Sequence, residues 1–361
     1  MIRDKKLLIL VTVLAFVLLV LLFVAAFCIP KAKVPSVQTP PATTGSTAPP
    51  TRQEQMVGIC LPARLEAWIG TGELLQKKLT ALGYKTRLVY GDGTAKAQNQ
   101  LLLELIENDI SCIVLAPVDS AGMAEADTAA LEKNIPIIAY GALLMDTEAV
   151  AGYVCYDYQA MGAELARYIE KKHTLSSAAA EERSYTVELF MGSPEDYNAV
   201  LLHKGILSVL EPYLSAGVLD CKSHRTAFED SCIYEWSGNA AEKACNSRLS
   251  SYPDSRPDIL ICASDSIADG VLRSLEAAGV TVENMPLVTG NGATTEGLAN
   301  LAAKKQAVTI QTDPEEPAEA CCAMVDRLLL GLETEMALST TFNNVTQIPT
   351  ALCGYKLIEG E

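Results

Sequence analysis

Histidine and aromatic side chains are scarce in this 361-residue chain, which has three histidines and 6% Phe, Trp and Tyr. Isolated histidines, together with cysteines that never show CxxC spacing, give no basis for a metal centre. The Gly-x-x-x-x-Gly-Lys phosphate loop, the complete dinucleotide fingerprint and the Gly-x-Ser-x-Gly elbow are also missing. We therefore expect no catalytic residues, no metal, no cofactor and no enzyme activity.

Positive charge is in short supply as well. The chain has 28 Lys and Arg against 44 Asp and Glu, a net charge of −16. Five of the basic residues and only one acidic residue precede residue 52, so residues 52–361 carry a net charge of −20. Binding to DNA or RNA requires a basic surface, so a nucleic-acid partner is not expected. An acidic surface of this kind favours solubility.

One long apolar run, Leu7–Ile29, stands near the start of the chain. Its 23 residues would form a helix of roughly 34 Å, enough to cross the hydrocarbon core of a bilayer. Basic residues precede the run and favour a cytoplasmic N-terminus. We therefore predict a cytoplasmic stub and transmembrane anchor over 1–29, a single-pass location in the cell membrane, and an extracytoplasmic position for the bulk of the chain.

Two other fates of this N-terminus stay open. A signal peptide could be cleaved near Ala25 and Ala26, although such a signal normally has a shorter apolar stretch. A lipid could be attached to Cys28, but Phe27 stands where a lipidation motif requires a small residue. Residues 30–53 are rich in Pro, Thr, Ser and Ala, which predicts a semi-extended linker.

From Val57 onward, short apolar runs alternate with amphipathic helical stretches. Nearly continuous apolar strands are typical of a parallel sheet that is covered by helices on both faces. About 310 residues exceed one comfortable core, so two lobes are expected. We predict an α/β fold of two Rossmann-like lobes with parallel sheets, joined by a hinge.

Eleven cysteines are unusual for a chain without an evident disulfide framework. Cys60, Cys112 and Cys262 lie in apolar strand-like runs, where a thiol packs as a small hydrophobe. The sequence leaves the disulfide state open, since Cys221, Cys232 and Cys245 could include one bridge.

Polar and aromatic residues follow the predicted strands. In open α/β sheets, ligands bind beyond the carboxyl ends of the strands. Carboxylates, amides and guanidinium groups bind hydroxyl pairs, and aromatic faces pack on the C–H side of a sugar ring. The candidate ligand-binding residues are Arg64, Trp68, Tyr140, Asp157, Asp196, Asn198, Asp265 and Asn291.

Several of these residues also have a purely structural interpretation. Asp196 and Asp265 precede predicted helices and could serve only as N-terminal caps. Asp157 could cap a helix or hold the hinge, and Trp68 could pack in the core. Arg64 is harder to explain structurally, because a charged group so close to a strand end usually has a specific partner.

Motifs around these residues resemble one known family. The chain reads Gly-Ser-Pro-Glu-Asp-Tyr-Asn-Ala over 192–199 and Val-Leu-Glu-Pro-Tyr-Leu over 209–214. It also has Arg-Leu-Glu-Ala-Trp over 64–68 and Ala-Ser-Asp over 263–265. Together these segments resemble the xylose and multiple-sugar branch of the type I periplasmic binding proteins, the solute-binding subunits of ABC sugar importers. The similarity extends from about Val57 to near Tyr355.

The resemblance implies two Rossmann-like lobes that are joined by three crossings and close on a ligand by hinge bending. The implied first lobe is 54–157 plus 292–333, and the second is 158–291 plus 334–361. The crossings would fall at Tyr156–Gln159, at Gly290–Gly292 and in the 330s.

Three positions depart from the family pattern. Tyr140-Gly141-Ala142 stands where the sugar-binding relatives have Tyr-Asp-Arg, and Asn291-Gly292 replaces their Gln-Asp. Within Gln311-Thr312-Asp313 the expected lysine is missing. Because a charged hydrogen bond contributes on the order of 1.5–3 kcal/mol, these losses mean either a different ligand or a loss of binding.

The expected function is that of a membrane-tethered, extracytoplasmic solute-binding protein. It would bind a small polar ligand, a sugar or sugar-like molecule, and deliver it as a monomer to an ABC permease. Two alternatives remain: a ligand sensor that partners a kinase or chemoreceptor, and a degenerate homologue that no longer binds sugar.

Overall fold

The computed structural model describes residues 51–178, 180–253, 256–332 and 339–360. The predicted anchor over 1–29 and the predicted linker as far as residue 50 lie outside these residues. Within the described ranges, every helix is too short or too polar to span a bilayer.

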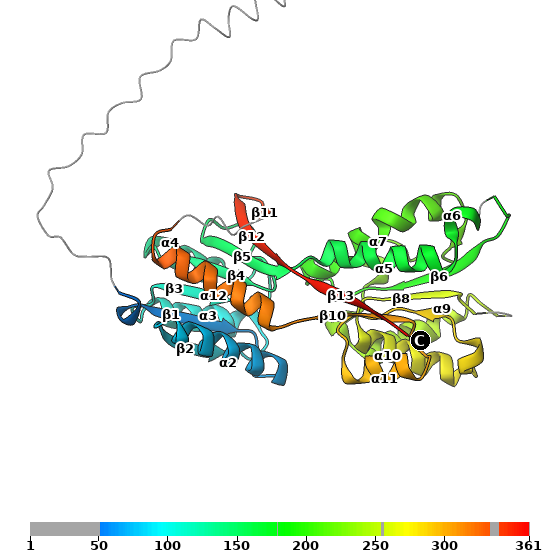
Figure 1. Ribbon diagram of the computed structural model, residues 1–361, viewed down its shortest axis with the longest axis horizontal. Helices are drawn as coiled ribbons and strands as arrows, with labels where there is room; N and C mark the ends of the chain where they lie inside the picture. The colour runs from blue at the N-terminus through cyan, green and yellow to red at the C-terminus, as the bar shows by residue number, and fades with distance from the viewer. Residues whose placement is uncertain (1–50, 179, 254–255, 333–338, 361) are drawn as a thin grey trace, which may run out of the picture. The chain divides into compact units, whose positions relative to one another are not determined.

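The first sheet has seven strands in the order β11-β12-β5-β4-β3-β1-β2 (Figure 1). All neighbours pair in parallel except β11 and β12, which are antiparallel. We call this sheet and its helices the first lobe. Its strands are β1 Met56–Leu61, β2 Lys85–Tyr90, β3 Cys112–Leu115, β4 Ile137–Tyr140, β5 Val150–Tyr156, β11 Ser339–Phe342 and β12 Gln347–Cys353. Its helices are α2 Glu66–Ala81, α3 Ala95–Ile106, α4 Ala124–Glu132 and α12 Glu315–Leu329.

Helices cover both faces of this sheet. Leu75 and Leu79 of α2 and Met324 of α12 belong to one buried cluster, while Leu102 of α3 and Ala130 of α4 belong to another. The four residues of β3 and the four of β4 are all buried. This burial explains their unbroken apolar sequence and confirms the prediction of parallel, doubly covered strands.

The second lobe has a four-stranded sheet in the order β7-β6-β8-β9 and a two-stranded pair, β10 with β13. A parallel bridge between Thr289 and Val308 joins the two sets. Its strands are β6 Tyr185–Phe190, β7 Leu219–Asp220, β8 Ile259–Cys262, β9 Leu287–Val288, β10 Val308–Thr312 and β13 Tyr355–Glu359. Its helices are α5 Tyr158–Lys172, α6 Leu175–Ala178, α7 Tyr197–Ser215, α8 Phe228–Ser231, α9 Gly238–Leu249, α10 Asp265–Ala277 and α11 Thr295–Ala302.

These pairings differ from the expected division of the chain. Residues 295–312 form α11 and β10 and pack with the second lobe, although 292–333 was expected in the first. Residues 339–353 form β11 and β12 of the first sheet, although 334–361 was expected in the second. The described chain therefore passes between the lobes after Tyr156, Thr312 and Cys353. Of the three expected crossings, only the one at Tyr156–Gln159 agrees with these pairings.

The ten described cysteines are all free thiols, nine of them buried. The bridge considered among Cys221, Cys232 and Cys245 is therefore not formed.

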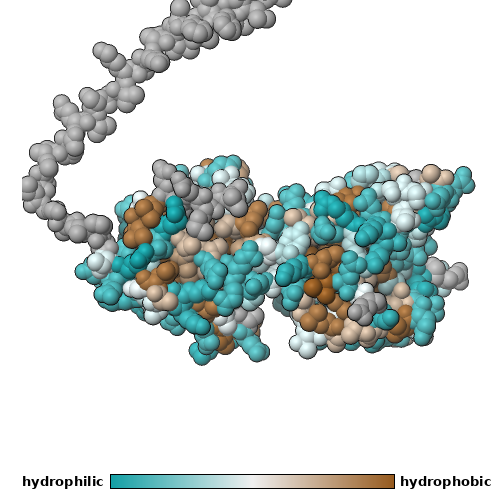
Figure 2. Space-filling view, in the orientation of Figure 1, coloured by the Kyte–Doolittle hydropathy of each residue, from teal (hydrophilic) through white to brown (hydrophobic). Residues whose placement is uncertain are grey.

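All residues of the three buried clusters lie between 57 and 353, so the segment 52–361 contains the described core and is expected to fold without the preceding residues. On the face shown in Figure 2, hydrophilic residues divide the apolar surface into separate patches.

Asp127 on α4 gives a testable pH dependence. Its side chain is 5% exposed, and its Oδ1 has no hydrogen-bond partner among the described residues. Burial raises the pKa of this carboxyl to about 6. Since the unfolded chain ionises at lower pH, Asp127 should make the protein less stable as the pH rises from about 4 to about 6.

Asp127→Asn should remove this dependence and raise the unfolding free energy near neutral pH by up to about 3 kcal/mol. Urea unfolding on both sides of the transition measures the effect, and Glu132→Gln on the exposed side of α4 is the control. Parallel pH profiles for Asp127→Asn and the original chain would contradict the expectation.

Candidate functional site

A cavity of about 640 Å³ is lined by segments of both lobes. The first lobe contributes Trp68 of α2, residues 116–120 after β3 and residues 140–142 at the end of β4. From the second lobe come Ser193, Glu195 and Asp196, which connect β6 to α7, Asn198 at the start of α7, and residues 235–236. Apart from Trp68 and the last pair, these segments are strand ends, where ligands bind in open α/β sheets.

Both tryptophans of the chain line this cavity. Trp68 lies in the first turn of α2, and Trp236 ends the short 3₁₀ helix Tyr234–Trp236. Each is half-buried. An indole face offers a large apolar surface to the C–H side of a sugar ring, and one such face comes from each lobe.

Trp236 is held against the strand end by close packing. A Cβ atom on Gly192 would lie only 2.3 Å from two carbons of the Trp236 indole, so only glycine fits beneath this ring. Glu235 and Trp236 have φ values of 56° and 54°, in the left-handed region. Such a backbone is strained for these residues and persists only where the surroundings impose it, as at many ligand sites.

The backbone of the preceding segment is tied to β6. Ile233 N donates to the Met191 carbonyl at 3.1 Å, and Glu235 N donates to Ser193 Oγ at 3.2 Å. Met191 and Cys232 also form a parallel bridge. These contacts fix the segment that carries Trp236 relative to the strand end.

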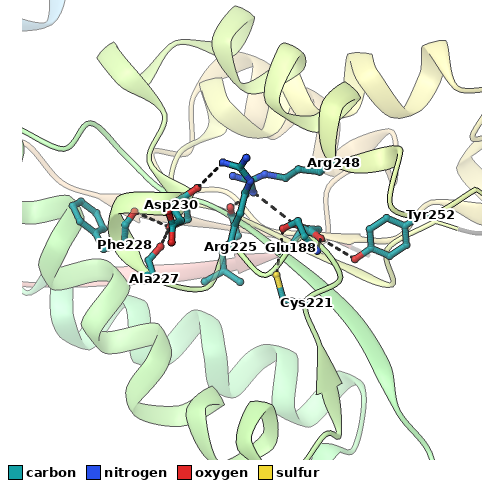
Figure 3. Close-up of polar contacts among 11 residues, drawn as sticks. Glu188, Cys221, Arg225, Ala227, Phe228, Asp230, Arg248 and Tyr252 are labelled. Atoms are coloured by element: carbon teal, nitrogen blue, oxygen red, sulfur yellow. Dashed lines mark hydrogen bonds and ion pairs between the residues drawn. The ribbon is translucent and has the colours of Figure 1, made fainter.

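A buried ionic network lies at β6 of the second lobe (Figure 3). Glu188 of β6 is fully buried and accepts hydrogen bonds from Ser223 N at 3.1 Å and the Tyr252 hydroxyl at 2.9 Å. Arg248 of α9 lies 3.8 Å from Glu188 and 4.1 Å above the Phe190 ring. Burial lowers the pKa of Arg248, and the Glu188 charge opposes this shift.

Asn198 and Asp196 carry the polar chemistry of the second-lobe wall. Asn198 is 7% exposed, and its Nδ2 donates to the Gly141 carbonyl of the first lobe at 2.8 Å. Asp196 accepts from Asn198 N at 2.9 Å and so caps α7. Burial raises the pKa of Asp196, while hydrogen bonds from the Asn198 backbone and the Trp236 side chain oppose the shift.

The charge of the lining is of one sign. Its charged residues are Asp119, Glu195, Asp196 and Glu235, and among the described residues no lysine or arginine lines the cavity. The cavity can therefore accept many hydrogen bonds. Within the described part of the chain, it offers no cationic side chain to an anionic group.

Four of the eight predicted site residues line this cavity together: Trp68, Tyr140, Asp196 and Asn198. Tyr140 is 7% exposed at the end of β4, and burial raises the pKa of its phenol. The other four predicted residues lie elsewhere. Arg64 is exposed, with its guanidinium 5.8 Å from the centre of the Tyr90 ring.

The remaining three predicted residues have structural partners. Asp157 caps α5 by accepting from Ala160 N at 2.9 Å. Asp265 is 1% exposed, and its carboxylate accepts from Thr294 N at 2.8 Å, Gln306 Nε2 at 2.9 Å and Thr309 Oγ1 at 2.7 Å. The Asn291 carbonyl accepts from Asp265 N at 2.9 Å. None of the three lines the cavity. Capping explains the residue type at Asp157 and buried hydrogen bonds explain it at Asp265, whereas the contact of Asn291 is made by its backbone.

The eight candidates did not include Trp236, Glu235, Asp119 or Tyr158, which also line the cavity. Asp119 follows a predicted strand and could have been found by the same reasoning as Tyr140. Trp236 does not follow a strand directly. The only sequence signal for it was the rarity of tryptophan in the chain.

Residues 57–333 match the family described as Periplasmic binding protein domain. The chain is 29% identical over 292 residues to the multiple sugar-binding periplasmic protein SbpA of Azospirillum brasilense, covering 80% of this chain and 81% of that protein. It is 29% identical over 301 residues to the multiple sugar-binding periplasmic receptor ChvE of Rhizobium radiobacter, covering 82% and 84%.

Solved structures give the same result. An ABC transporter solute-binding protein from Clostridium phytofermentans with bound β-D-glucose superposes with a TM-score of 0.79 at 28% identity, covering 85% of this chain and 94% of that one. The resemblance indicated by the motifs is thus confirmed, and the relatives are named as sugar-binding proteins rather than enzymes.

Proposed function

Because the chain belongs to the family of periplasmic binding protein domains, we propose that it is a membrane-tethered, extracytoplasmic receptor that binds a sugar or sugar derivative for an ABC importer. The ligand would occupy the cavity between Trp68 and Trp236. The apolar run Leu7–Ile29 would form the tether, and 30–53 the linker. The sugar-binding relatives and the glucose-bound neighbour support the ligand class.

The observation that carries the proposal is the position of the two tryptophans. They come from different lobes and line the same cavity. A ring bound between them would contact both lobes at once. A ligand that contacts both lobes favours their closed arrangement by its differential affinity for that state.

One of the three departures from the family pattern lies in this cavity. Gly141 and Ala142 line it in place of a carboxylate and a guanidinium. The Gly141 carbonyl already accepts from Asn198. Hydroxyl recognition would therefore fall to Asp119, Asp196 and Ser193, which the same cavity provides.

Thermal unfolding of residues 52–361 against pentoses, hexoses, amino sugars and polyols tests the proposal. A ligand at about 100 times its Kd should stabilise the folded state by about 2.7 kcal/mol. Stabilisation by at least one compound supports the proposal. A flat response to the whole panel would contradict it and favour a degenerate cleft.

Gly192→Ala is expected to weaken binding of any sugar found in that panel by roughly tenfold, because the new Cβ would displace the Trp236 indole. The affinity is measured by calorimetry. Gly70→Ala is the control, since a Cβ there meets nothing within 4 Å. Equal affinities for the two variants would show that Trp236 does not touch the ligand.

A further inference from the structure

The cavity of the proposed function has an excess of hydrogen-bond acceptors and negative charge. Asp119 and Asp196 are half-buried in its walls, whereas Glu195 and Glu235 are exposed. The lining includes no lysine or arginine. A ligand that binds here would meet carboxylates from both lobes, with no lysine or arginine of the described residues in the lining.

The internal partners of these carboxylates are neutral. Asp119 accepts from Ala121 N at 2.9 Å, Glu195 from Ser193 Oγ at 2.7 Å and Asp196 from Asn198 N at 2.9 Å. The ion pairs among the described residues join other side chains. Within the described chain, the negative charge of the cavity is therefore not neutralised by a salt bridge.

The negative charge of the cavity affects which ligands can bind, because a bound ligand would remove water from the carboxylates. Removing a carboxylate from water is costly unless a counter-charge or several donors replace the water. A ligand that fills the cavity would displace water from Asp119 and Asp196. A neutral hydroxyl supplies one donor, whereas an ammonium group supplies three donors and a positive charge.

The indole faces favour the same chemistry. Indole is the aromatic side chain that attracts cations most strongly, while its face also packs against the C–H bonds of a ring. Trp68 and Trp236 thus suit a ring-shaped ligand that carries a positive charge. This observation is independent of the carboxylates.

We propose that the ligand is an amino sugar, with its protonated amino group bound by Asp119 and Asp196 and its ring packed on Trp68 and Trp236. The inference rests on the proposed sugar-binding function. It adds to that function that the ligand carries a positive charge, and it assigns the selection for this charge to Asp119 and Asp196.

Calorimetric titration of residues 52–361 tests the inference with matched sets of sugars. Each set contains a hexose, its 2-amino form and its N-acetylated 2-amino form, in the gluco, galacto and manno series. At about pH 6, where the amine is protonated, the 2-amino form of one series should bind at least about tenfold tighter than the other two forms. The preference should weaken as salt is added, since the attraction is electrostatic.

Two variants locate the selectivity. Asp196→Asn keeps an N-cap residue and should reduce the amino preference severalfold, measured as the ratio of the affinities for the 2-amino form and the neutral hexose. Asp119→Asn should act in the same direction. Glu296→Gln changes an exposed carboxylate on α11 and is the control for net charge.

The outcomes separate the two proposals. A neutral or N-acetylated sugar that binds as tightly as the amino form would overturn the amino-sugar inference and leave the sugar-binding function intact. An amino preference that both aspartate variants retain would overturn the assignment of the carboxylates. Absence of binding by every compound would overturn the inference and the proposed function together.

Discussion

Glu188→Ala is expected to lower the unfolding free energy by about 3–5 kcal/mol, because Arg248 would be left buried without its counter-charge. Glu188 is 0% exposed and Arg248 is 6% exposed. The substitution would also remove the acceptor of Ser223 N and of the Tyr252 hydroxyl. Urea unfolding followed by circular dichroism measures the loss.

A surface pair provides the matched control for this prediction. Arg183 and Glu181 form an ion pair at 2.6 Å, with side chains that are 38% and 54% exposed. Glu181→Ala should leave the unfolding free energy nearly unchanged, since exposed pairs contribute little. Similar losses for Glu188→Ala and Glu181→Ala would mean that burial does not determine the strength of the Glu188 network.

Trp236→Ala is expected to weaken sugar binding by about 100-fold, or roughly 2.7 kcal/mol, because it removes one of the two aromatic faces of the cavity. Trp236→Phe should retain part of the affinity, since a smaller aromatic face remains. Calorimetry with the most tightly bound sugar of the panel measures both effects.

Tyr234→Ala is the control for Trp236. Tyr234 belongs to the same 3₁₀ helix, is 65% exposed and does not line the cavity. Its removal should leave the affinity unchanged. If Tyr234→Ala and Trp236→Ala weakened binding equally, the effect would come from the helix as a whole and not from the indole face.

The strands that bury both faces could be predicted from their sequences. β1, β3, β4 and β8 are short apolar runs between turns, the pattern that predicts buried strands of a parallel sheet. The partner of each strand could not be read in the same way. β12 pairs with β5, and β13 pairs with β10, although only Gly354 separates β12 from β13. Such pairing depends on tertiary packing rather than on local pattern.

The candidate site was predicted in part, for a comparable reason. Tyr140 at the end of β4 lines the cavity, as do Asp196 and Asn198 after β6. Asp157 and Asp265 also follow strands, but their carboxylates are used by backbone N–H groups and buried side chains. A capping aspartate and a ligand-binding aspartate look the same in sequence. Trp236 lies on an irregular connection with positive φ, which no sequence period reveals.

Intrinsic tryptophan fluorescence tests the central claim most directly, because the chain has two tryptophans and both line the proposed sugar cavity. Titration with a sugar that stabilises residues 52–361 should change the emission with a single saturable curve, and Trp68→Phe and Trp236→Phe should each retain part of the change. A sugar that stabilises the protein while leaving the emission of both tryptophans unaltered would contradict a ligand bound between them.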